Sequence, residues 1–557
     1  MSVTITRHYA TVEGNRQVQY RRAGEGPPVI LLHQSPTSSK EYTPLIQQLA
    51  ENYTVIAPDT PGNGMSDPLP IEKPVMTDYA NHVAALMDEL GIEKCPVYGF
   101  HTGGLCTLEL AWRHPERLTV GVMNGYIQMT PEERQEILDN YFAVFQPDWS
   151  GSHLTWAWSR FREQTIFFPW FRKDGNSRMN YDIPPAPALQ EAVMEFLRAG
   201  DNYRHPYRCA FTADTVSAVK EMKGNMVVMT AKTDVLWTYH QRLGKTSDSV
   251  TKVAAETAAD AIKHLVSLLS DNVSHQPSLA IAPTKPLPGR IWAEYFQVEE
   301  FSFYARRNTD GSGRPVVMQH SSAGSSFAMD RLMTEFIGKR PVIAFDLPGN
   351  GESDNPVGSD VQVESQADWL AKCIRAAGYD EVDFIGHWGG GTVGVELAIQ
   401  HPSLVKNLAI PNLICPDNVT RDEYLANYTP DIEYDDYGCH LIKAWNILRD
   451  QELYAPWYRR KKDHVIRAAE PDIAPDTIQR RVVDLFKCIE IWQSAYAAHF
   501  SYPMTNKLSA VTCPVLLGSP DSDQTKRAVS SGIDNCTVRS LSKEAPALAS
   551  ELLMFIA

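Results

Sequence analysis

The chain has 557 residues, of which 43% are hydrophobic and 21% charged, as in an ordinary globular protein with room for more than one domain. Its net charge of −15 disfavours nucleic acid or an anionic membrane surface as the main partner, because both require a basic face. The N-terminus has no signal-like apolar segment, no apolar run could span a bilayer, and the nine cysteines form no CxxC pair, which together predict a cytoplasmic protein.

Strands and helices are predicted to alternate along the first half. Short apolar runs at 29–32 and 54–59 indicate buried parallel strands, and the residues between them have helical spacing. An amphipathic helix is expected over 79–90, with Gly91 as its C-cap. The remaining predicted elements are a strand at 95–100, a helix at 105–115 and strands at 120–125 and 225–234. This order is typical of an α/β fold, a mostly parallel twisted sheet flanked by helices on both faces.

Two segments rich in Trp, Phe and Arg interrupt this pattern, at about 126–222 and about 413–506. Neither contains a recognisable strand. We expect each to form a helical cap over the carboxyl ends of the strands, where open α/β sheets bind their ligands.

The chain repeats itself at a fixed spacing. PVILLHQSPTSS begins at Pro28 and PVVMQHSSAGSS at Pro315, 287 positions later, and the same offset relates DTPGNGMSD at Asp59 to DLPGNGESD at Asp346. A constant offset indicates a duplication with almost no insertion. We therefore expect copy one over residues 1–275, a Pro- and Ser-rich linker over 276–290 and copy two over 291–557. The two copies would form an intramolecular pseudo-dimer.

These motifs resemble the α/β-hydrolase superfamily, and the resemblance covers essentially the whole chain, twice. His33 and Gln34 lie where the family has its His-Gly oxyanion loop. Residues 99–103, GFHTG, resemble the nucleophile elbow G-x-S-x-G, a sharp turn between strand and helix. The resemblance implies two tandem α/β-hydrolase-fold domains that need no cofactor.

The two copies depart from the family at the catalytic positions. His101 occupies the nucleophile position of copy one and Trp388 that of copy two, where the family has Ser, Asp or Cys. The family's catalytic His should follow the acid by about 20–30 residues, in a loop after the last strand. The segments VTKVAAETAAD at 250–260 and TVRSLSKEAPA at 537–547 contain no histidine, and His264 is expected on the surface of a helix.

The family's acid position persists as Asp234 and Asp521. With no downstream histidine to orient, each is interpreted as a remaining carboxylate that caps a loop. Asp234 is nevertheless kept, with His101, as a catalytic candidate.

His101 could act as a general base, because imidazole titrates near neutral pH. The first helical amides after the elbow, Thr102 and Gly103, together with the amide of Gln34, could hold an oxyanion or a carboxylate. This combination favours water activation, proton abstraction or a lyase step over an acyl-enzyme route. The alternative is that His101 is a relic in an inert pocket.

A metal site is a further alternative. His33, His101, His153 and Asp234 could converge on one pocket, and three histidines with a carboxylate would suit zinc. However, these candidates include no closely spaced pair of metal-ligand residues. In the family that the chain resembles, the histidine of the oxyanion loop usually has a structural role. We therefore expect no metal.

Copy two is expected to be catalytically silent. The indole of Trp388 cannot attack, accept a proton or bind a metal, and it would fill the elbow pocket. The positions in copy two that correspond to the candidate site are His320, Ser321, Trp388 and Asp521.

Both caps carry the pattern G-x-H-L-x-x-A-W-x-x-x-R-x-Q. His153, Trp158 and Arg162 of copy one correspond to His440, Trp445 and Arg449 of copy two. Trp158 and Arg162 are four residues apart and share a helix face. They form either a structural stack that docks the cap, or a pocket for an aromatic or carboxylate-bearing small molecule.

The sequence leaves two principal hypotheses. In the first, copy one is an enzyme that uses His101 for hydrolysis or lyase-type chemistry on a small molecule. In the second, the chain is a non-catalytic double pseudo-hydrolase that binds a small molecule or acts as a scaffold. An ordinary serine hydrolase would need a stray serine such as Ser35 beside a base.

Overall fold

The computed structural model describes residues 3–467, 470–530, 532–533 and 535–557. Its contacts divide the chain into unit 1, Met1–Lys285 with Tyr434–Ile442, and unit 2, Pro286–Glu433 with Lys443–Ala557. Each unit contains one eight-stranded sheet, so the chain consists of two tandem α/β domains.

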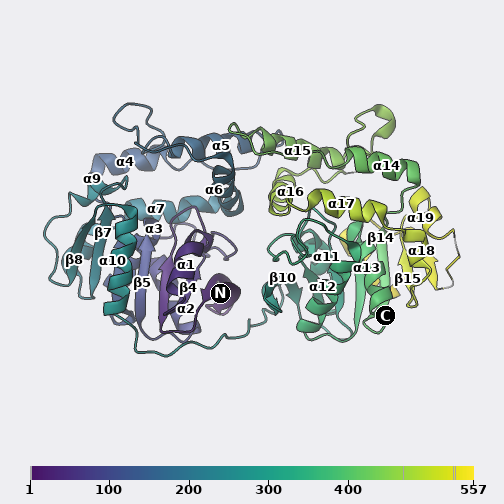
Figure 1. Ribbon diagram of the computed structural model, residues 1–557, viewed down its shortest axis with the longest axis horizontal. Helices are drawn as coiled ribbons and strands as arrows, with labels where there is room; N and C mark the ends of the chain where they lie inside the picture. Colours follow the sequence, from purple (N-terminus) through teal and green to yellow (C-terminus); the bar gives the residue numbers. More distant parts are fainter. Residues whose placement is uncertain (1–2, 468–469, 531, 534) are drawn as a thin grey trace. The chain divides into compact units, whose positions relative to one another are not determined.

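The sheet of unit 1 has the strand order β1-β2-β4-β3-β5-β6-β7-β8. Strand β2 is antiparallel to β1 and to β4, and the strands from β4 to β8 are parallel (Figure 1). The central strands are buried on both faces, which explains their unbroken apolar sequences. The strands are β1 Thr6–Val12, β2 Arg16–Ala23, β3 Pro28–Leu32, β4 Thr54–Pro58, β5 Cys95–Phe100, β6 Leu118–Asn124, β7 Met226–Ala231 and β8 Val250–Ala255.

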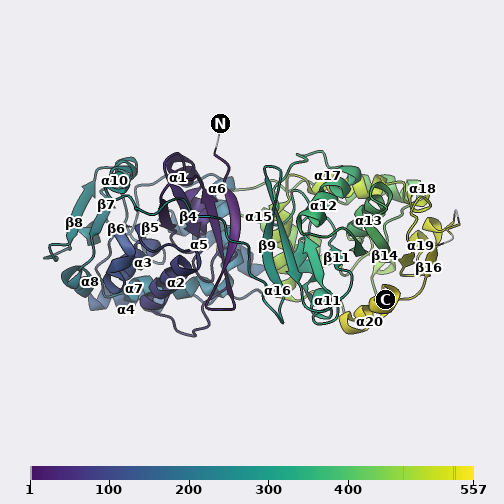
Figure 2. The same ribbon diagram turned by 90° about the horizontal axis from the view of Figure 1, so that it is seen from below.

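Helices cover both faces of this sheet, as Figure 2 shows, with α1 and α10 on one side and α2 and α3 on the other. Alternate residues of β3 serve the two faces: Val29 and Leu31 belong to the cluster that includes Ile46 of α1 and Leu265 of α10. The predicted two-faced α/β sheet is confirmed. The helices are η1 Ser39–Tyr42, α1 Thr43–Leu49, α2 Met76–Glu89, α3 Thr102–Arg113, η2 Pro115–Arg117, α9 Trp237–His240 and α10 Ala258–Asp271.

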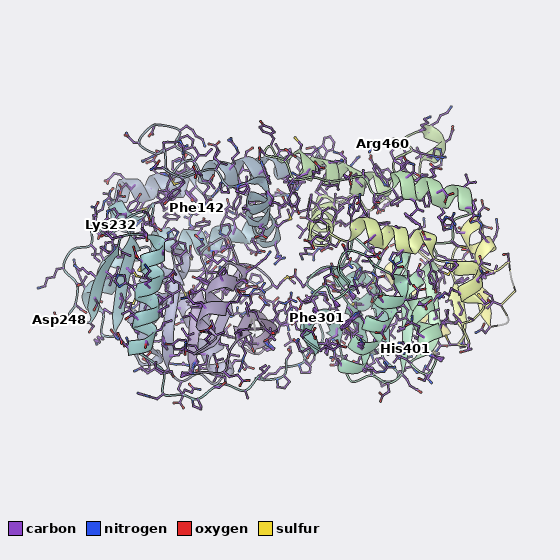
Figure 3. All side chains as sticks on the ribbon, in the orientation of Figure 1. Phe142, Lys232, Asp248, Phe301, His401 and Arg460 are labelled. Atoms are coloured by element: carbon purple, nitrogen blue, oxygen red, sulfur yellow. The ribbon has the colours of Figure 1, made fainter. Side chains whose placement is uncertain are left out.

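The predicted cap of unit 1 is built mainly from helices, with an isolated bridge between Phe167 and Arg178. It lies between β6 and β7, above the carboxyl ends of the strands in Figure 1. Phe142, labelled in Figure 3, packs inside the cap against the rings of Tyr207 and Phe211. The cap helices are α4 Pro131–Asn140, α5 Ser152–Gln164, α6 Ala186–Ala199, η3 Gly200–Tyr203, α7 Arg204–Thr212 and α8 Thr215–Glu221.

Unit 2 has the same architecture, with the strand order β16-β15-β14-β13-β11-β12-β10-β9. Its strands are β9 Trp292–Val298, β10 Phe301–Asn308, β11 Val316–Gln319, β12 Val342–Phe345, β13 Val382–His387, β14 Val405–Asn412, β15 Val515–Leu517 and β16 Cys536–Val538. The helices packed on its sheet are η4 Ser326–Met329, α11 Asp330–Thr334, α12 Val363–Ala376, α13 Gly389–Gln400, α19 Asp523–Ala528 and α20 Ala545–Phe555. The helices of the second cap are α14 Asn418–Asn427, α15 Cys439–Gln451, η5 Lys462–His464, α16 Pro475–Lys487, α17 Trp492–Ser501 and α18 Met504–Leu508, and the first four residues of α15 belong to unit 1.

Candidate active site

His101 stands at a sharp turn between β5 and α3. Its backbone has φ 46° and ψ −109°, a conformation that non-glycine residues seldom adopt. The equivalent residue of unit 2, Trp388, has φ 51° and ψ −117°. An imidazole and an indole therefore occupy the two elbows, as the sequence predicted.

The imidazole of His101 contacts the candidate acid directly. Its Nε2 lies 3.0 Å from Oδ2 and 3.2 Å from Oδ1 of Asp234, on the loop after β7. Asp234 also accepts the Leu236 amide at 2.8 Å, so it caps its loop as interpreted from the sequence, and in addition it contacts the elbow histidine. Burial opposes ionisation of Asp234, but the charge and hydrogen bond of His101 and the amide of Leu236 outweigh it and lower the pKa of the carboxyl.

Local packing fixes the orientation of the imidazole. The ring of Phe100 stacks on it, with centroids 4.0 Å apart. Gly125 lies beside it, and a Cβ atom there would come within 2.4 Å of His101 Cδ2. In unit 2, Asn412 is the counterpart of Asn124, since the carbonyl oxygen of each accepts the elbow amide, and the next position is taken by Leu413 in place of Gly125. The ring thus depends on a glycine that copy two lacks.

A cavity of about 500 Å³ opens above the elbow, between the sheet and the cap. His101 lines it with Gln34, Ser35 and Thr102, and the cap adds mostly aromatic and aliphatic walls. A volume of this size suits a small organic molecule. The cap side is formed by Ile127, Tyr141, Gln164, Thr165, Phe168, Met179, Tyr181, Asp182, Pro184, Tyr207, Ala210 and Phe211, and the remaining wall by Leu105, Val235 and Leu236.

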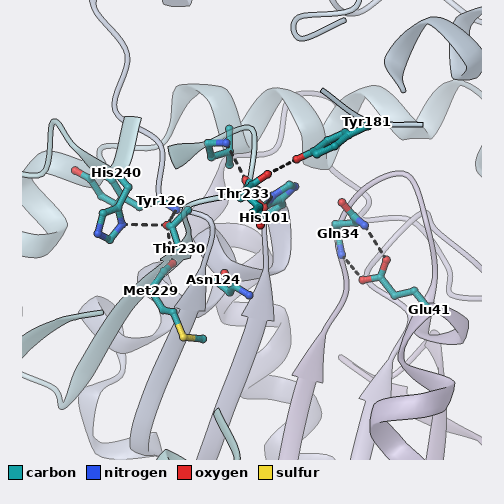
Figure 4. Close-up of polar contacts among 12 residues, drawn as sticks. Gln34, Glu41, His101, Asn124, Tyr126, Tyr181, Met229, Thr230, Thr233 and His240 are labelled. Carbon is teal, nitrogen blue, oxygen red and sulfur yellow. Dashed lines mark hydrogen bonds and ion pairs between the residues drawn. The ribbon is translucent and has the colours of Figure 1, made fainter. Parts of the chain in front are cut away.

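Gln34 is not available as an oxyanion donor in this structure. Its amide N–H donates to Oε1 of Glu41 at 2.9 Å, and its side-chain Nε2 donates to Oε2 at 3.1 Å, as Figure 4 shows. The predicted donor role of Gln34 is therefore wrong for this state, because a neighbouring carboxylate takes its amide. Burial raises the pKa of Glu41, although hydrogen bonds and His33 oppose the shift.

Thr102 and Gly103 lie in the first turn of α3, where backbone N–H groups have no partner within the helix. Thr102 lines the cavity, whereas Gly103 packs against β3. A Cβ atom on Gly103 would lie 1.9 Å from the carbonyl oxygen of Leu32. Gly103 is thus required for the close approach of helix and strand.

The four residues considered for zinc do not converge. The Nε2 of His33 accepts the Thr60 amide at 2.8 Å and its Nδ1 contacts the Gln34 carbonyl oxygen at 2.6 Å, so the ring serves the loop. His153 Nδ1 accepts the Asp148 amide at 3.0 Å. Across the described ranges, no group of three or more His, Cys, Asp or Glu side chains is placed to hold a metal ion.

Of the cap pattern found in the repeat, Gln164 lines the cavity, whereas His153, Trp158 and Arg162 do not. Trp158 is buried, and its indole nitrogen donates to the carbonyl oxygen of Asp436 at 3.0 Å, while the side chain of Arg162 is partly exposed beside Glu163. The contacts of His153, Trp158 and Arg162 in this structure are therefore with the cap and solvent and not with the cavity. Sequence reasoning missed Tyr141, Tyr207 and Arg160, because they belong to no short motif.

The elbow of unit 2 is arranged differently. Trp388 is 47% exposed, which contradicts the expectation that its ring fills the pocket. The amide of Gly389 donates to Ser321 Oγ at 3.3 Å, and Asp521 is exposed on the loop after β15. His320, like His33, holds its loop: its Nε2 accepts the Leu347 amide at 3.2 Å.

Unit 2 also contains a Ser–His contact that the sequence did not suggest. Ser322 Oγ lies 2.9 Å from Nε2 of His499 in α17, and both side chains are almost fully buried. Burial lowers the pKa of His499 to about 4, which makes it a weak base. In unit 1 the corresponding serine, Ser35, has a buried hydroxyl with no hydrogen-bond partner in the described part of the chain.

Comparison with known proteins identifies the family. The model for the alpha/beta hydrolase fold matches residues 27–157 and 314–426. The soluble epoxide hydrolase of Corynebacterium sp. (strain C12) is 41% identical over 211 residues, which cover 36% of this chain and 68% of that protein. An uncharacterized hydrolase of Saccharomyces cerevisiae is 34% identical over 145 residues, 26% of this chain and 48%, about half, of the yeast protein.

Among solved structures, epoxide hydrolase A from Mycobacterium thermoresistibile aligns with 49% of this chain and 100% of its own, at 17% identity and a TM-score of 0.39. The chain belongs to the α/β-hydrolase fold family, which it contains as a tandem duplication. Within the residues that the structure describes, none of the helices is both long and apolar enough to span a membrane.

Proposed function

We propose that unit 1 is an enzyme in which His101, paired with Asp234, acts as general base in hydrolysis or a lyase-type step on a small, mostly apolar molecule. The observation that carries this proposal is the 3.0 Å contact between His101 Nε2 and Asp234 Oδ2, made by a histidine that lines a cavity of about 500 Å³. The imidazole is 25% exposed, so it remains accessible from that cavity.

The pairing assigns roles to the two ring nitrogens. With Nε2–H donated to Asp234, the lone pair of Nδ1 is left to accept a proton, and Nδ1 has no hydrogen-bond partner among the described residues. It would remove a proton from water, which then attacks the substrate, or from a hydroxyl or carbon of the substrate itself. Asp234 would stabilise the imidazolium formed in that step.

The surroundings favour chemistry that makes modest demands on an oxyanion hole. Because Glu41 occupies the Gln34 amide, the Thr102 amide is the elbow donor that remains at the cavity. Epoxide opening, ester or lactone hydrolysis and retro-aldol-type cleavage all fit a base of this kind. The Corynebacterium relative that carries the name soluble epoxide hydrolase makes epoxides a sensible first class to test.

For unit 2 we propose no catalysis. Its elbow indole cannot accept a proton, and its acid is exposed rather than paired with the elbow residue. The Ser322–His499 contact is closed to substrate by burial. Absence of fluorophosphonate labelling at Ser322 is the expected result.

The test compares wild type with His101→Ala on aromatic epoxides, esters, lactones and β-hydroxy ketones. We expect turnover of at least one class by wild type and a loss of about 100-fold or more in kcat/KM for His101→Ala, as when a general base is removed. Trp388→Ala, the matched change at the other elbow, should leave turnover unchanged.

Unchanged turnover in His101→Ala would remove this residue from the mechanism. A second candidate function, binding without catalysis, is favoured by the occupied Gln34 amide. It would be supported if compounds bind the cavity, as a thermal shift reports, while no product forms with any substrate class.

A further inference from the structure

Arg160, in helix α5, is a buried cation behind the wall of the unit 1 cavity. Its side chain is 3% exposed, and its guanidinium packs on the rings of Tyr141 and Trp170, 5.1 and 4.6 Å from their centroids. Its Nε has no hydrogen-bond partner among the described residues, and no described carboxylate forms an ion pair with it. A buried charge without an opposite charge is costly to fold.

The duplication shows that the cap does not need this charge. At the equivalent position, 287 residues later, copy two has Ile447, which is also 3% exposed. The flanking residues are retained, since Gln164 corresponds to Gln451 and Trp170 to Trp457. A hydrocarbon side chain therefore satisfies the same packing in the copy that lacks a base at its elbow.

Arg160 reaches the cavity through a chain of polar groups. Its Nη1 donates to Oε1 of Gln164, and Gln164 Nε2 donates to the hydroxyl oxygen of Tyr207 at 3.2 Å. Gln164 thus accepts a hydrogen bond from Arg160, and Tyr207 accepts one from Gln164. Both Gln164 and Tyr207 line the cavity. The remaining Tyr207 proton is then available for a ligand or for Tyr141.

A second hydroxyl lies in the same cluster. Tyr141 also lines the cavity, and its ring centroid lies 5.6 Å from that of Tyr207 and 5.1 Å from Cζ of Arg160. Burial raises the pKa of both Tyr141 and Tyr207, so each hydroxyl keeps its proton at neutral pH. The cap side of the cavity thus presents donors polarised by a positive charge.

We propose that Arg160, Gln164, Tyr207 and Tyr141 form a subsite for a carboxylate group, so that the ligand of unit 1 is a small aromatic or aliphatic acid. The rest of the ligand would fill the apolar cavity toward His101. Charge-assisted hydrogen bonds in a desolvated site select an anion over a neutral group of the same shape. The one carboxylate in the cavity lining, Asp182, is exposed to solvent, where its repulsion is screened. This inference extends the proposed function, since it names the substrate class of the same site.

The experiment measures binding rather than turnover. Calorimetric titrations of the full chain would use phenylacetate, 3-phenylpropanoate and 4-phenylbutanoate, each beside its neutral amide. We expect at least one acid to bind about 10-fold or more tightly than its amide, and Arg160→Ile, which copies unit 2, to erase that preference. Arg162→Ala, which changes a partly exposed arginine on the same helix that does not line the cavity, should retain this preference.

His101→Ala separates the two proposals. Carboxylate preference should survive in this variant, because the subsite does not include the elbow, so loss of turnover with retained preference supports both. If Arg160→Ile does not fold, Tyr207→Phe is the second variant, because it removes the last hydrogen-bond donor of the series from Arg160 to the cavity. It should lower the affinity for the acid by a similar factor and the affinity for the amide by less. Equal affinity of acids and amides in wild type, or a preference unchanged in Arg160→Ile, would overturn the subsite.

Discussion

The His101–Asp234 pair contains one residue fewer than a serine triad, because the histidine itself occupies the elbow position. In a triad, the carboxylate holds one imidazole nitrogen and the other nitrogen faces the serine. Here Asp234 holds Nε2 of a histidine that itself occupies the elbow. In the mechanism proposed for unit 1, Nδ1 would act directly on substrate or water, without a covalent acyl-enzyme.

Asp234→Asn tests the orienting role of the acid. The amide can still contact His101 Nε2, but it offers a donor as readily as an acceptor and no longer stabilises an imidazolium. We expect kcat to fall by about 100- to 10,000-fold with KM little changed, by analogy with the aspartate-to-asparagine change in serine proteases.

The readout is steady-state kinetics on whichever substrate wild type turns over. Asp182→Asn is the matched control, because this exposed carboxylate lines the cavity without contacting His101. A kcat for Asp234→Asn within about threefold of wild type would show that the contact with His101 is not catalytic.

Gly125 is the residue that gives the imidazole its room. Gly125→Ala would place a Cβ atom 2.4 Å from His101 Cδ2, at a position where φ is +100°. We expect turnover to fall at least about 100-fold, because the ring must leave its place beside Asp234. The positive φ alone should cost about 1 kcal/mol of folding free energy.

Gly91→Ala separates these two effects. Gly91 has φ +68°, and a Cβ atom added there would meet no atom within 4 Å, so it shares the backbone strain without the clash. It should lower the melting temperature by a similar amount while turnover is retained. Equal loss of turnover in both variants would mean that strain, and not the position of His101, explains the effect.

At the scale of elements, the elbow depends on how closely α3 approaches β3. Gly103→Ala would place a Cβ atom 1.9 Å from the Leu32 carbonyl oxygen, against backbone that cannot yield without moving the sheet. We expect a loss of about 3 kcal/mol or more, seen as a lower melting temperature. Gly175→Ala, where an added Cβ would meet no atom within 4 Å, should have almost no effect.

The apolar strands and the amphipathic helices were predictable from the sequence. Residues 95–100 were expected as a strand and form β5, because each of them except Phe100 is buried in the middle of the sheet. The helix expected at 79–90 begins three residues earlier, at Met76, where Asp78 accepts the Val75 amide at 2.8 Å. Hydrophobic periodicity carries information about burial but little about such capping contacts.

Edge strands are harder to recognise. Strands β1 and β2 form an antiparallel hairpin with β1 at the edge of the sheet, and polar residues such as Arg7, Arg21 and Arg22 interrupt any apolar run in them. The sequence places residues 250–255 in the loop after the last strand, yet they form β8 at the other edge. An edge strand is exposed on one side, so its sequence is polar and its existence depends on the neighbouring strand.

The cap shows how much residue spacing can predict about the orientation of a helix. Trp158 and Arg162 do share a face of α5, as their spacing predicted, but that face lies against Asp436 and Gly438 or solvent. Arg160 and Gln164, also four residues apart, lie on the face toward the cavity. Spacing tells which residues are neighbours, whereas only the packed helix tells which face meets the site.

At the scale of the whole molecule, the two copies share a fold but not their polar interiors. Unit 1 keeps an acid–base pair at an open cavity, whereas unit 2 buries several ionisable groups at the corresponding edge of its sheet. In both units, burial holds certain histidines in the neutral form. This has a measurable consequence for stability as a function of pH.

Acid should destabilise the protein well above the usual range of carboxylate protonation. Burial lowers the pKa of His82 in unit 1 to about 3, with Arg16 adding to the shift, and lowers that of His320 and His499 in unit 2 to about 4. Below pH about 6.5 the unfolded chain takes up protons at these residues while the folded chain does not. Each histidine therefore costs about 1.4 kcal/mol of stability per pH unit as the pH falls from about 6.5 toward 4.

Part of this loss is offset in unit 2. Burial raises the pKa of Asp346 to about 6, so the folded chain gains a proton there before the unfolded chain does, and stability rises as the pH falls toward 4. Unit 1 offers the cleaner test through His82, whose Nδ1 lies 3.0 Å from Arg16 Nη2. His82→Gln keeps an acceptor for Arg16 and cannot be protonated.

We expect the melting temperature of wild type to fall between pH 7.5 and pH 5.0, and to fall less in His82→Gln, by the equivalent of about 2 kcal/mol. Scanning calorimetry at both pH values, with His264→Gln as the control, provides the measurement; His264 is exposed on α10 and should behave as wild type. The explanation fails if the melting temperatures of wild type and His82→Gln change equally with pH. A histidine that stays neutral in the folded chain must make the melting temperature fall as the pH falls.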